Sequence, residues 1–192
     1  MPGRIKQRLR QLHAFGLLTC FLLASAHRCF SQTPGYEYQV KAAFLFNFAK
    51  FVEWPNQAFP RADTSFTICL AGDPFQGAVE QTIEGERLEG RALVVRRVAP
   101  GDSVRECHLL YVSQSEARRA PEIISAARNL PILTVGEPDD FINAGGMIRF
   151  TESGHRIKFQ INPDAAERAS LRVSSKLLRL ADIARPRRPG LE

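Results

Sequence analysis

The sequence predicts a single α/β domain: a mixed sheet with a parallel centre and an antiparallel hairpin at one edge, with helices on both faces. Two patterns support this prediction. Short apolar runs alternate with helix-like stretches, and three of these runs lead directly into a helix, as buried parallel strands do. Near the C-terminal third the pattern changes, and two strand-like runs flank a glycine-containing turn that is typical of a hairpin.

The first residues, 1–26, have the three features of a secretory signal peptide. Basic residues come first, an uncharged apolar run from Ala14 to Ala26 follows, and Ala24-Ser25-Ala26 matches a small-x-small cleavage site. The apolar run, about 13 residues, is shorter than the roughly 20 that cross a bilayer. We therefore expect export and cleavage, and an uncleaved N-terminal anchor is the alternative.

The charge distribution argues against a nucleic-acid partner. The chain has a formal net charge of +6, and cleavage after Ala26 removes four basic residues and no acidic ones, which lowers the charge from +6 to +2. The remaining positive charge is scattered, apart from the arginine-rich and proline-rich end, 185–192. This end is typical of a flexible, solvated tail.

The mature chain begins with a long helical candidate, Tyr36–Trp54, which ends before Pro55 because a proline ring cannot continue a helix. The β-rich run Phe66–Ala71 comes next and predicts the first strand of the sheet. A helix is expected from Asp73 to Glu84, with Asp73 as N-cap and Pro74 as the first helical residue.

The later elements alternate in the same way. The further expected strands are Ala92–Val98, His108–Ser113, Ile132–Val135, Met147–Thr151 and His155–Ile161. The further expected helices are Glu116–Arg128, a helical turn at Asp139–Asn143 and the amphipathic stretch Ser174–Ile183. The last two strands flank Glu152-Ser153-Gly154, where the glycine permits a positive φ, and they form the predicted edge hairpin.

Two cysteines remain in the predicted domain, Cys69 and Cys107. Cys20 leaves with the signal peptide, and Cys29 lies within three residues of the cut. In an oxidising compartment an isolated pair forms a disulfide more often than a metal site, and no CxxC or His-x-x-His spacing accompanies this one. We expect no metal and no other cofactor.

Few residues suggest catalysis. The histidines after the expected cut are His27, His108 and His155, and no spacing pairs them with a serine or cysteine nucleophile. Gly72–Gly77 lacks the Lys-Ser/Thr of a phosphate-binding loop, and the pair Asp139–Asp140 is typical of solvated surface. We therefore predict no catalytic residue. The alternative is an unrecognised hydrolase, which requires His108 or His155 beside a serine in a cleft.

The first helix carries aromatic residues on two sides. At about 100° per residue, one apolar face is expected to pack in the core. Its members are Val40, Phe44, Phe48 and Phe51. Phe46 falls on the charged side, and Trp54 ends the helix. Phe46 and Trp54 are candidates for partner binding, because Phe and Trp concentrate binding energy at interfaces, and burial against another element is the alternative.

Six segments follow one another in a recognisable order. They are Tyr38–Pro55, Cys69–Phe75, Cys107–Ser113, Leu133–Val135, Gly145–Phe150 and Ser174–Ala181. In this order they resemble the YfiR family of periplasmic proteins, and they define a predicted domain, 36–184. The resemblance implies that Cys69 and Cys107 form the structural disulfide of the family. The second cysteine pair of the best understood member is absent here, so redox switching through a second bridge is not implied.

The resemblance also implies a function. It predicts a periplasmic protein that binds the periplasmic segment of an inner-membrane diguanylate cyclase, represses it, and so lowers cyclic-di-GMP and biofilm output. A sensor kinase is the second class of partner, and an outer-membrane OmpA-like lipoprotein that sequesters the repressor is a further one. A homodimer remains open. The alternative function is a periplasmic small-molecule binding domain, which predicts a deep apolar pocket.

Overall fold

Helices and strands alternate in the computed structural model, which describes residues 34–154 and 156–186. The helices are α2 (Pro34–Lys50), η2 (Asn56–Ala58), α3 (Ala78–Ile83), η3 (Gln114–Glu116), α4 (Ala120–Ala127), α5 (Pro163–Arg168) and α6 (Ser175–Leu178). The strands are β1 (Val52–Glu53), β2 (Phe66–Ala71), β3 (Arg87–Leu88), β4 (Arg91–Arg97), β5 (Leu109–Val112), β6 (Leu133–Gly136), β7 (Ile148–Ser153), β8 (Arg156–Ile161), β9 (Arg172–Val173) and β10 (Asp182–Ile183). The predicted signal peptide, 1–26, and His155 lie outside the described residues.

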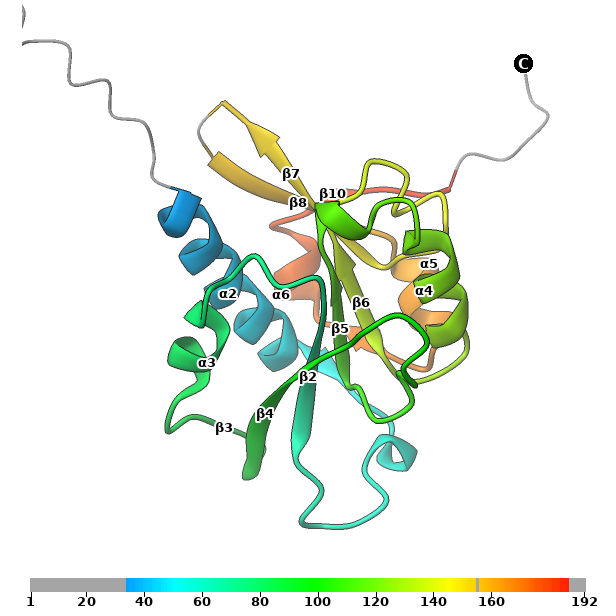
Figure 1. The fold of residues 1–192 in the computed structure, drawn as a ribbon. Helices are drawn as coiled ribbons and strands as arrows, with labels where there is room; N and C mark the ends of the chain where they lie inside the picture. Colours follow the sequence, from blue (N-terminus) through cyan, green and yellow to red (C-terminus); the bar gives the residue numbers. More distant parts are fainter. Residues whose placement is uncertain (1–33, 155, 187–192) are drawn as a thin grey trace, which may run out of the picture. The chain divides into compact units, whose positions relative to one another are not determined.

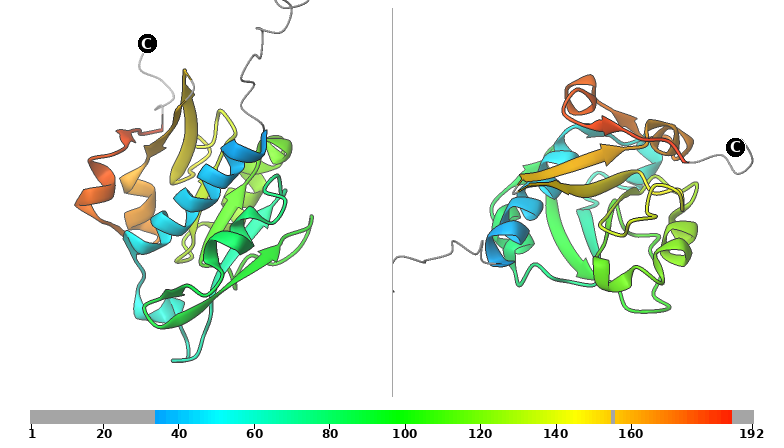
Figure 2. Two further views of the ribbon diagram at one scale, coloured as in Figure 1. Left: turned by 90° about the vertical axis from the view of Figure 1, so that its left-hand side faces the viewer. Right: turned by 90° about the horizontal axis from the view of Figure 1, so that it is seen from above.

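Eight strands form one mixed sheet in the order β10-β8-β7-β6-β5-β2-β4-β3 (Figure 1). β4, β2, β5, β6 and β7 are parallel neighbours, and the antiparallel pairs β7–β8 and β3–β4 lie toward the two ends. The predicted mixed sheet with a parallel centre and an antiparallel hairpin is therefore confirmed. The hairpin projects beyond the rest of the sheet (Figure 2), and Gly154 in its turn has a φ of 64°.

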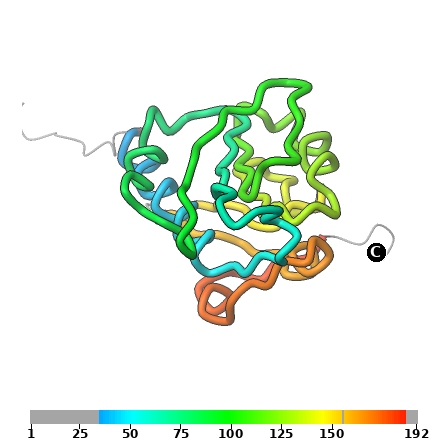
Figure 3. Tube along the Cα trace, turned by 90° about the horizontal axis from the view of Figure 1, so that it is seen from below, coloured from blue at the N-terminus to red at the C-terminus, as the bar shows by residue number. Residues whose placement is uncertain are grey.

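The sheet separates two hydrophobic clusters, because successive side chains of a strand point to opposite faces. On β2, Ile68 and Leu70 join the larger cluster beneath α2 and α3, whereas Cys69 and Ala71 join the smaller one beneath α4. Helices thus cover both faces, as predicted. The C-terminal segment that contains α5, β9 and α6 lies at one side of the domain, away from the β4–β5 connection (Figure 3).

The predicted C-terminal helix, Ser174–Ile183, is wrong for most of its length. Ser174 caps a single helical turn, because its hydroxyl accepts a hydrogen bond from the amide of Leu177. The chain then becomes β10, which pairs in parallel with β8. This pairing makes β10, not the hairpin, the outermost strand on that side of the sheet.

The first helix is shorter than predicted at its C-terminal end. The expected helix Tyr36–Trp54 ends at Lys50, and β1 follows before Pro55. The reason is a long-range pairing: β1 is antiparallel to β9, and the amide of Ser174 donates to the carbonyl of Phe51. Tertiary pairing therefore replaces the last turn that the local pattern favours.

The two central helices also begin later than predicted. Asp73 caps a turn instead of α3, because its carboxylate accepts a hydrogen bond from the amide of Phe75, and Gly77 occupies the N-cap position. Of the helix expected over Glu116–Arg128, only α4 forms, and η3 ends at Glu116. Asp139–Asn143 forms turns, and the amide of Ala144 donates to the carbonyl of Asp140 at 2.8 Å, but no regular helix is present there.

Candidate functional site

The disulfide between Cys69 and Cys107 is present, and it joins the centre of the sheet to the β4–β5 connection. The two Cα atoms are 5.7 Å apart, and both cysteines are buried in the smaller cluster. On the same face, the guanidinium of Arg96 lies 3.3 Å from the sulfur of Cys107 and donates to the carbonyl of Ser103 at 2.8 Å. The bridge is therefore part of a packed unit that includes β4.

Phe46 and Trp54, the two candidates for partner binding, both face other side chains. Phe46 is 9% exposed and belongs to the larger cluster, while Lys50 lies over its ring at 5.0 Å. Trp54 is half-buried, with its ring 4.9 Å from that of Phe66 in an edge-to-face contact. This geometry favours the core-packing alternative, and partner binding by Phe46 and Trp54 stays a prediction.

The single apolar face predicted for the first helix does not describe its burial, because α2 is buried on more than one side. Ala42, Leu45 and Phe46 are all buried in addition to the expected Phe48, whereas Phe51 is 36% exposed. A single-face analysis assumes one covered side, and α2 packs against both α3 and the sheet.

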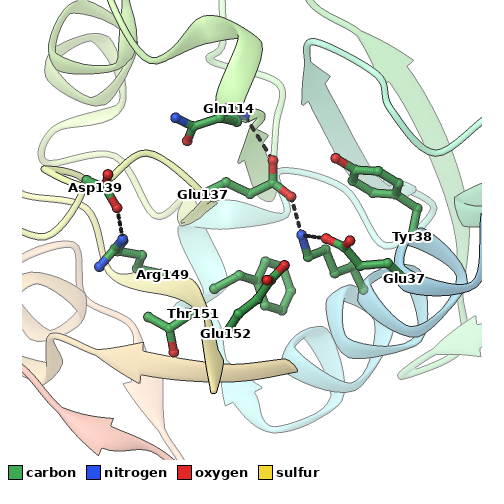
Figure 4. Close-up of a pocket in the computed structure, with 10 residues that line it drawn as sticks. Glu37, Tyr38, Gln114, Glu137, Asp139, Arg149, Thr151 and Glu152 are labelled. Carbon is green, nitrogen blue, oxygen red and sulfur yellow. Dashed lines mark hydrogen bonds and ion pairs between the residues drawn. The ribbon is translucent and has the colours of Figure 1, made fainter. Parts of the chain in front are cut away.

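A polar hollow of about 340 Å³ opens at the carboxyl edge of the central strands (Figure 4). It lies between the first turns of α2, the residues that follow β5 and β6, and the projecting part of β7. Its lining consists of Glu37, Tyr38, Lys41, Gln114, Glu137, Asp139, Arg149, Phe150, Thr151 and Glu152. Ligand sites of open α/β sheets lie at this edge, so the hollow is the natural candidate for a binding site.

Lys41 is the central cation of the hollow. Its ammonium donates to Glu37, one turn earlier, and to Glu137 after β6 at 2.6 Å (Figure 4). Burial alone would lower the pKa of Lys41, but the hydrogen bonds to these two carboxylates outweigh it and raise the pKa above its ordinary value. Glu137 also accepts a hydrogen bond from the amide of Gln114 at 2.9 Å, so it connects α2 to two central strands.

The remaining polar groups of the hollow are less buried. Arg149 on β7 forms an ion pair with Asp139, whose carboxylate is otherwise exposed (Figure 4). Below the hollow, burial raises the pKa of Tyr111, and the charge of Glu137 acts in the same direction. The phenol of Tyr111 is therefore neutral.

His108, the histidine considered for catalysis, has a structural role. Its Nδ1 accepts a hydrogen bond from the amide of Thr67, and its Nε2 lies 3.0 Å from the carbonyl of Ala58, to which it donates. The ring stacks on Phe59 and Phe66. Burial lowers the pKa of His108, and the nearby Arg91 acts in the same direction, so the ring is neutral. Both ring nitrogens are engaged with the backbone, and no serine in the described part of the chain shares them.

At the carboxyl ends of β2 and β5, where the order of the strands in the sheet reverses, the loops pack together and leave no room for a ligand site. A Cβ atom on Gly72 would lie 2.1 Å from Oγ of Ser113 and 2.8 Å from Oγ of Ser115. The loops after the two strands thus approach closely, and the hollow lies one strand further along. Within the described residues, no group of three His, Cys, Asp or Glu side chains is placed to hold a metal ion.

A family model described as YfiR/HmsC-like matches residues 38–182, which is most of the chain. The chain belongs to the YfiR/HmsC-like family. At the level of the family, YfiR-like proteins are periplasmic regulators of diguanylate cyclases and are regulatory instead of catalytic. None of the helices described in residues 34–154 and 156–186 has the length and hydropathy of a bilayer-spanning segment.

Sequence reasoning missed the central ion pairs of this YfiR/HmsC-like domain. Lys41 and Glu137 are 96 residues apart, so no local pattern connects them. One signal was present: Lys41 stands in an otherwise largely apolar stretch of the first helix, where a lone charge needs a partner. The pair Asp139–Asp140 is exposed, as expected, but the ion pair of Asp139 with Arg149 has no local sequence signal.

Proposed function

We propose that this chain is a periplasmic regulator that represses a membrane-bound diguanylate cyclase by binding its periplasmic segment. The main support for this proposal is that the chain belongs to the YfiR/HmsC-like family. A membrane sensor kinase is the second class of partner, and an outer-membrane OmpA-like lipoprotein is the proposed sequestering partner. Repression follows if the domain binds the inactive arrangement of the periplasmic segment more tightly than the active one.

Features of the site support binding over catalysis. The single histidine considered in detail is neutral and held by backbone groups, and the hollow contains paired charges instead of a nucleophile and a base. The small-molecule alternative predicts a deep apolar pocket, whereas the hollow beside Lys41 is lined largely by charged side chains. The proposed contact of Phe46 and Trp54 with the partner requires their rings to become exposed, and the alanine variants in the Discussion test this.

The direct test measures cyclic-di-GMP formation by the membrane cyclase in the presence of the mature chain. The cyclase is first recovered with the mature domain from solubilised membranes and identified by mass spectrometry. It is then placed in vesicles with its periplasmic segment outward-facing, and the mature chain is added to saturation. We expect cyclic-di-GMP formation to fall; an unchanged rate with a bound domain would remove repression from the proposal.

A matched experiment in cells addresses localisation. Deletion of the gene is expected to raise cyclic-di-GMP, and expression of the full chain is expected to restore the original level. A version without residues 1–26 remains in the cytoplasm if these residues are the export signal, and it should not restore the level. Restoration by this shortened version would contradict a periplasmic site of action.

A further inference from the structure

The outer edge of β4 is largely unpaired among the described residues. β3 pairs with β4 only at Arg91 and Ala92, so the stretch Leu93–Arg97 has a neighbouring strand on one side alone, β2. β4 lies at the outer side of the sheet, next to the short β3 (Figures 1 and 2). A strand edge of this kind presents free backbone N–H and C=O groups and is a template for one more strand.

The register shows which backbone groups are free. The amide of Val98 donates to the carbonyl of Leu70 in β2. Because alternate residues of a strand direct their backbone groups to the same side, Val94 and Arg96 also face β2. Leu93, Val95 and Arg97 therefore direct their N–H and C=O groups outward.

The β3–β4 turn agrees with this assignment. Leu88 and Arg91 pair across Glu89 and Gly90, whose φ values of 49° and 81° are those of a type I′ turn. In such a two-residue hairpin the residues that flank the turn exchange both backbone hydrogen bonds, so Arg91 also faces outward. The free groups thus continue the series that Arg91 begins.

A wedge-shaped hollow of about 610 Å³ lies beside this free edge. It forms where the residues before β3 separate from β4 and lead back to α3. Ile83, Leu93 and Val95 contribute its apolar surface. Glu84 and Glu86 lie at its rim, both are exposed, and neither is in an ion pair within the described residues. Arg87 and Glu80 also line the wedge, and Glu80 is paired with Arg97. With Glu84 and Glu86 against the cation Arg87, the rim keeps an excess of negative charge.

We propose that the edge Leu93–Arg97 binds an extended segment of the partner as an added strand. One apolar side chain of that segment enters the wedge, and a Lys or Arg side chain lies next to Glu84 and Glu86. The partner is the periplasmic segment of the cyclase, so this inference rests on the proposed function. On the opposite face of the strand Val94, which is 41% exposed, offers a further apolar contact.

A second copy of this chain that paired with the same edge about Val95 would collide with β3. In an antiparallel pairing about Val95, Leu93 of one copy lies opposite Arg97 of the other. The next residue of that second copy, Val98, would then lie opposite Ala92, where Arg87 of β3 is already paired. A segment that covers only the free stretch avoids this collision.

The test compares Val95→Pro with Val95→Ala. Both variants lose the valine side chain, but only proline removes the outward N–H, and proline is tolerated on the open side of an edge strand. The probe is the purified periplasmic segment of each membrane diguanylate cyclase of the source organism, titrated against the mature chain. We expect Val95→Pro to bind at least about tenfold more weakly than Val95→Ala. Thermal unfolding and an intact Cys69–Cys107 bridge verify the fold of each variant.

Amide hydrogen exchange on the unaltered chain supplies a second readout that needs no variant. Binding should slow exchange at Leu93, Val95 and Arg97, while Val94 and Arg96, which already face β2, change little. If Val95→Pro does not fold, Glu84→Lys/Glu86→Lys replaces it, with Glu167→Lys on α5 as a control for added charge. We expect the double variant to bind at least about fivefold more weakly and the control to bind normally.

The outcomes separate the two proposals. If the unaltered chain binds none of the segments, the proposed function fails and this inference fails with it. If the chain binds but Val95→Pro equals Val95→Ala and the outward amides stay unprotected, the strand-addition inference is overturned and the proposed function stands. Protection of the same amides in the free chain that increases with its own concentration would identify a second copy as the occupant, which also overturns the inference.

Discussion

Removal of the Cys69–Cys107 bridge is expected to cost a large part of the stability of the domain. The bridge closes a loop with a sequence separation of 38 residues. In the chain-entropy model this loop contributes about 4 kcal/mol to the free energy of unfolding at 25 °C. Typical domains are stable by about 5–15 kcal/mol, so the loss is a substantial fraction of the total.

The perturbation has two forms that separate the covalent link from the packing of the sulfurs. Reduction of the unaltered chain removes only the link and should lower the unfolding free energy by about 4 kcal/mol. The Cys69→Ala/Cys107→Ala variant also loses two buried sulfur atoms, at roughly 1 kcal/mol each, and should be less stable than the reduced chain.

Urea unfolding followed by circular dichroism, with and without reductant, measures both quantities. The variant is the matched control for reductant, because its stability should not depend on it. If the reduced and oxidised forms of the unaltered chain differ by less than about 1 kcal/mol, the loop-entropy reasoning is refuted for this domain.

Three further predictions follow from the buried side chains. Phe46→Ala and Trp54→Ala should each lower the unfolding free energy by about 3 kcal/mol, because both rings pack against core residues. A small loss of stability together with weakened cyclase binding would instead support partner contact. In the folded chain the pKa of His108 lies below its ordinary value of 6.5, so the unfolded chain takes up the proton first. The stability measured by urea unfolding should therefore fall as the pH decreases from about 6.5, and the His108→Asn variant should lack this slope. Lys41→Met should cost about 3 kcal/mol because it leaves Glu137 buried without its cation. Lys41→Met/Glu137→Leu should recover much of that loss in the same urea assay, and a double variant less stable than Lys41→Met would contradict an unpaired Glu137 as the cause.

The parts of the fold that the sequence predicts well are those with strong local patterns. The bounds of β2 match because Phe66–Ala71 is a β-rich run, buried except for the partly exposed Thr67, that ends at Gly72, a residue with a φ of 71°. The hairpin matches because Gly154 permits the turn and apolar residues flank it on both sides. The bounds of β2 and of the hairpin can therefore be predicted from the local sequence alone.

The errors occur where distant segments pair. β1 replaces the end of the first helix because Val52 pairs with Val173, and β10 replaces the end of the last helix because Ile183 pairs with Ile161. In both places the helical pattern is real but weaker than a backbone pairing that no local window contains. The site has the same property, since the ion pair of Lys41 with Glu137 joins residues 96 positions apart.

The position of the disulfide connects stability to the proposed docking edge. β4 is in register with β2 along Leu93–Arg97, and the side chain of Arg96, on the face of the sheet that carries the smaller cluster, contacts Cys107 and the carbonyl of Ser103. The disulfide, Arg96 and β2 together therefore hold β4 in place on the side opposite its free edge. A preformed edge binds an added strand without a further ordering cost, whereas a loosened edge must be ordered on binding. Loss of the bridge should thus weaken partner binding even under conditions in which the domain remains folded, and this effect would separate a docking role of β4 from a docking role of α2.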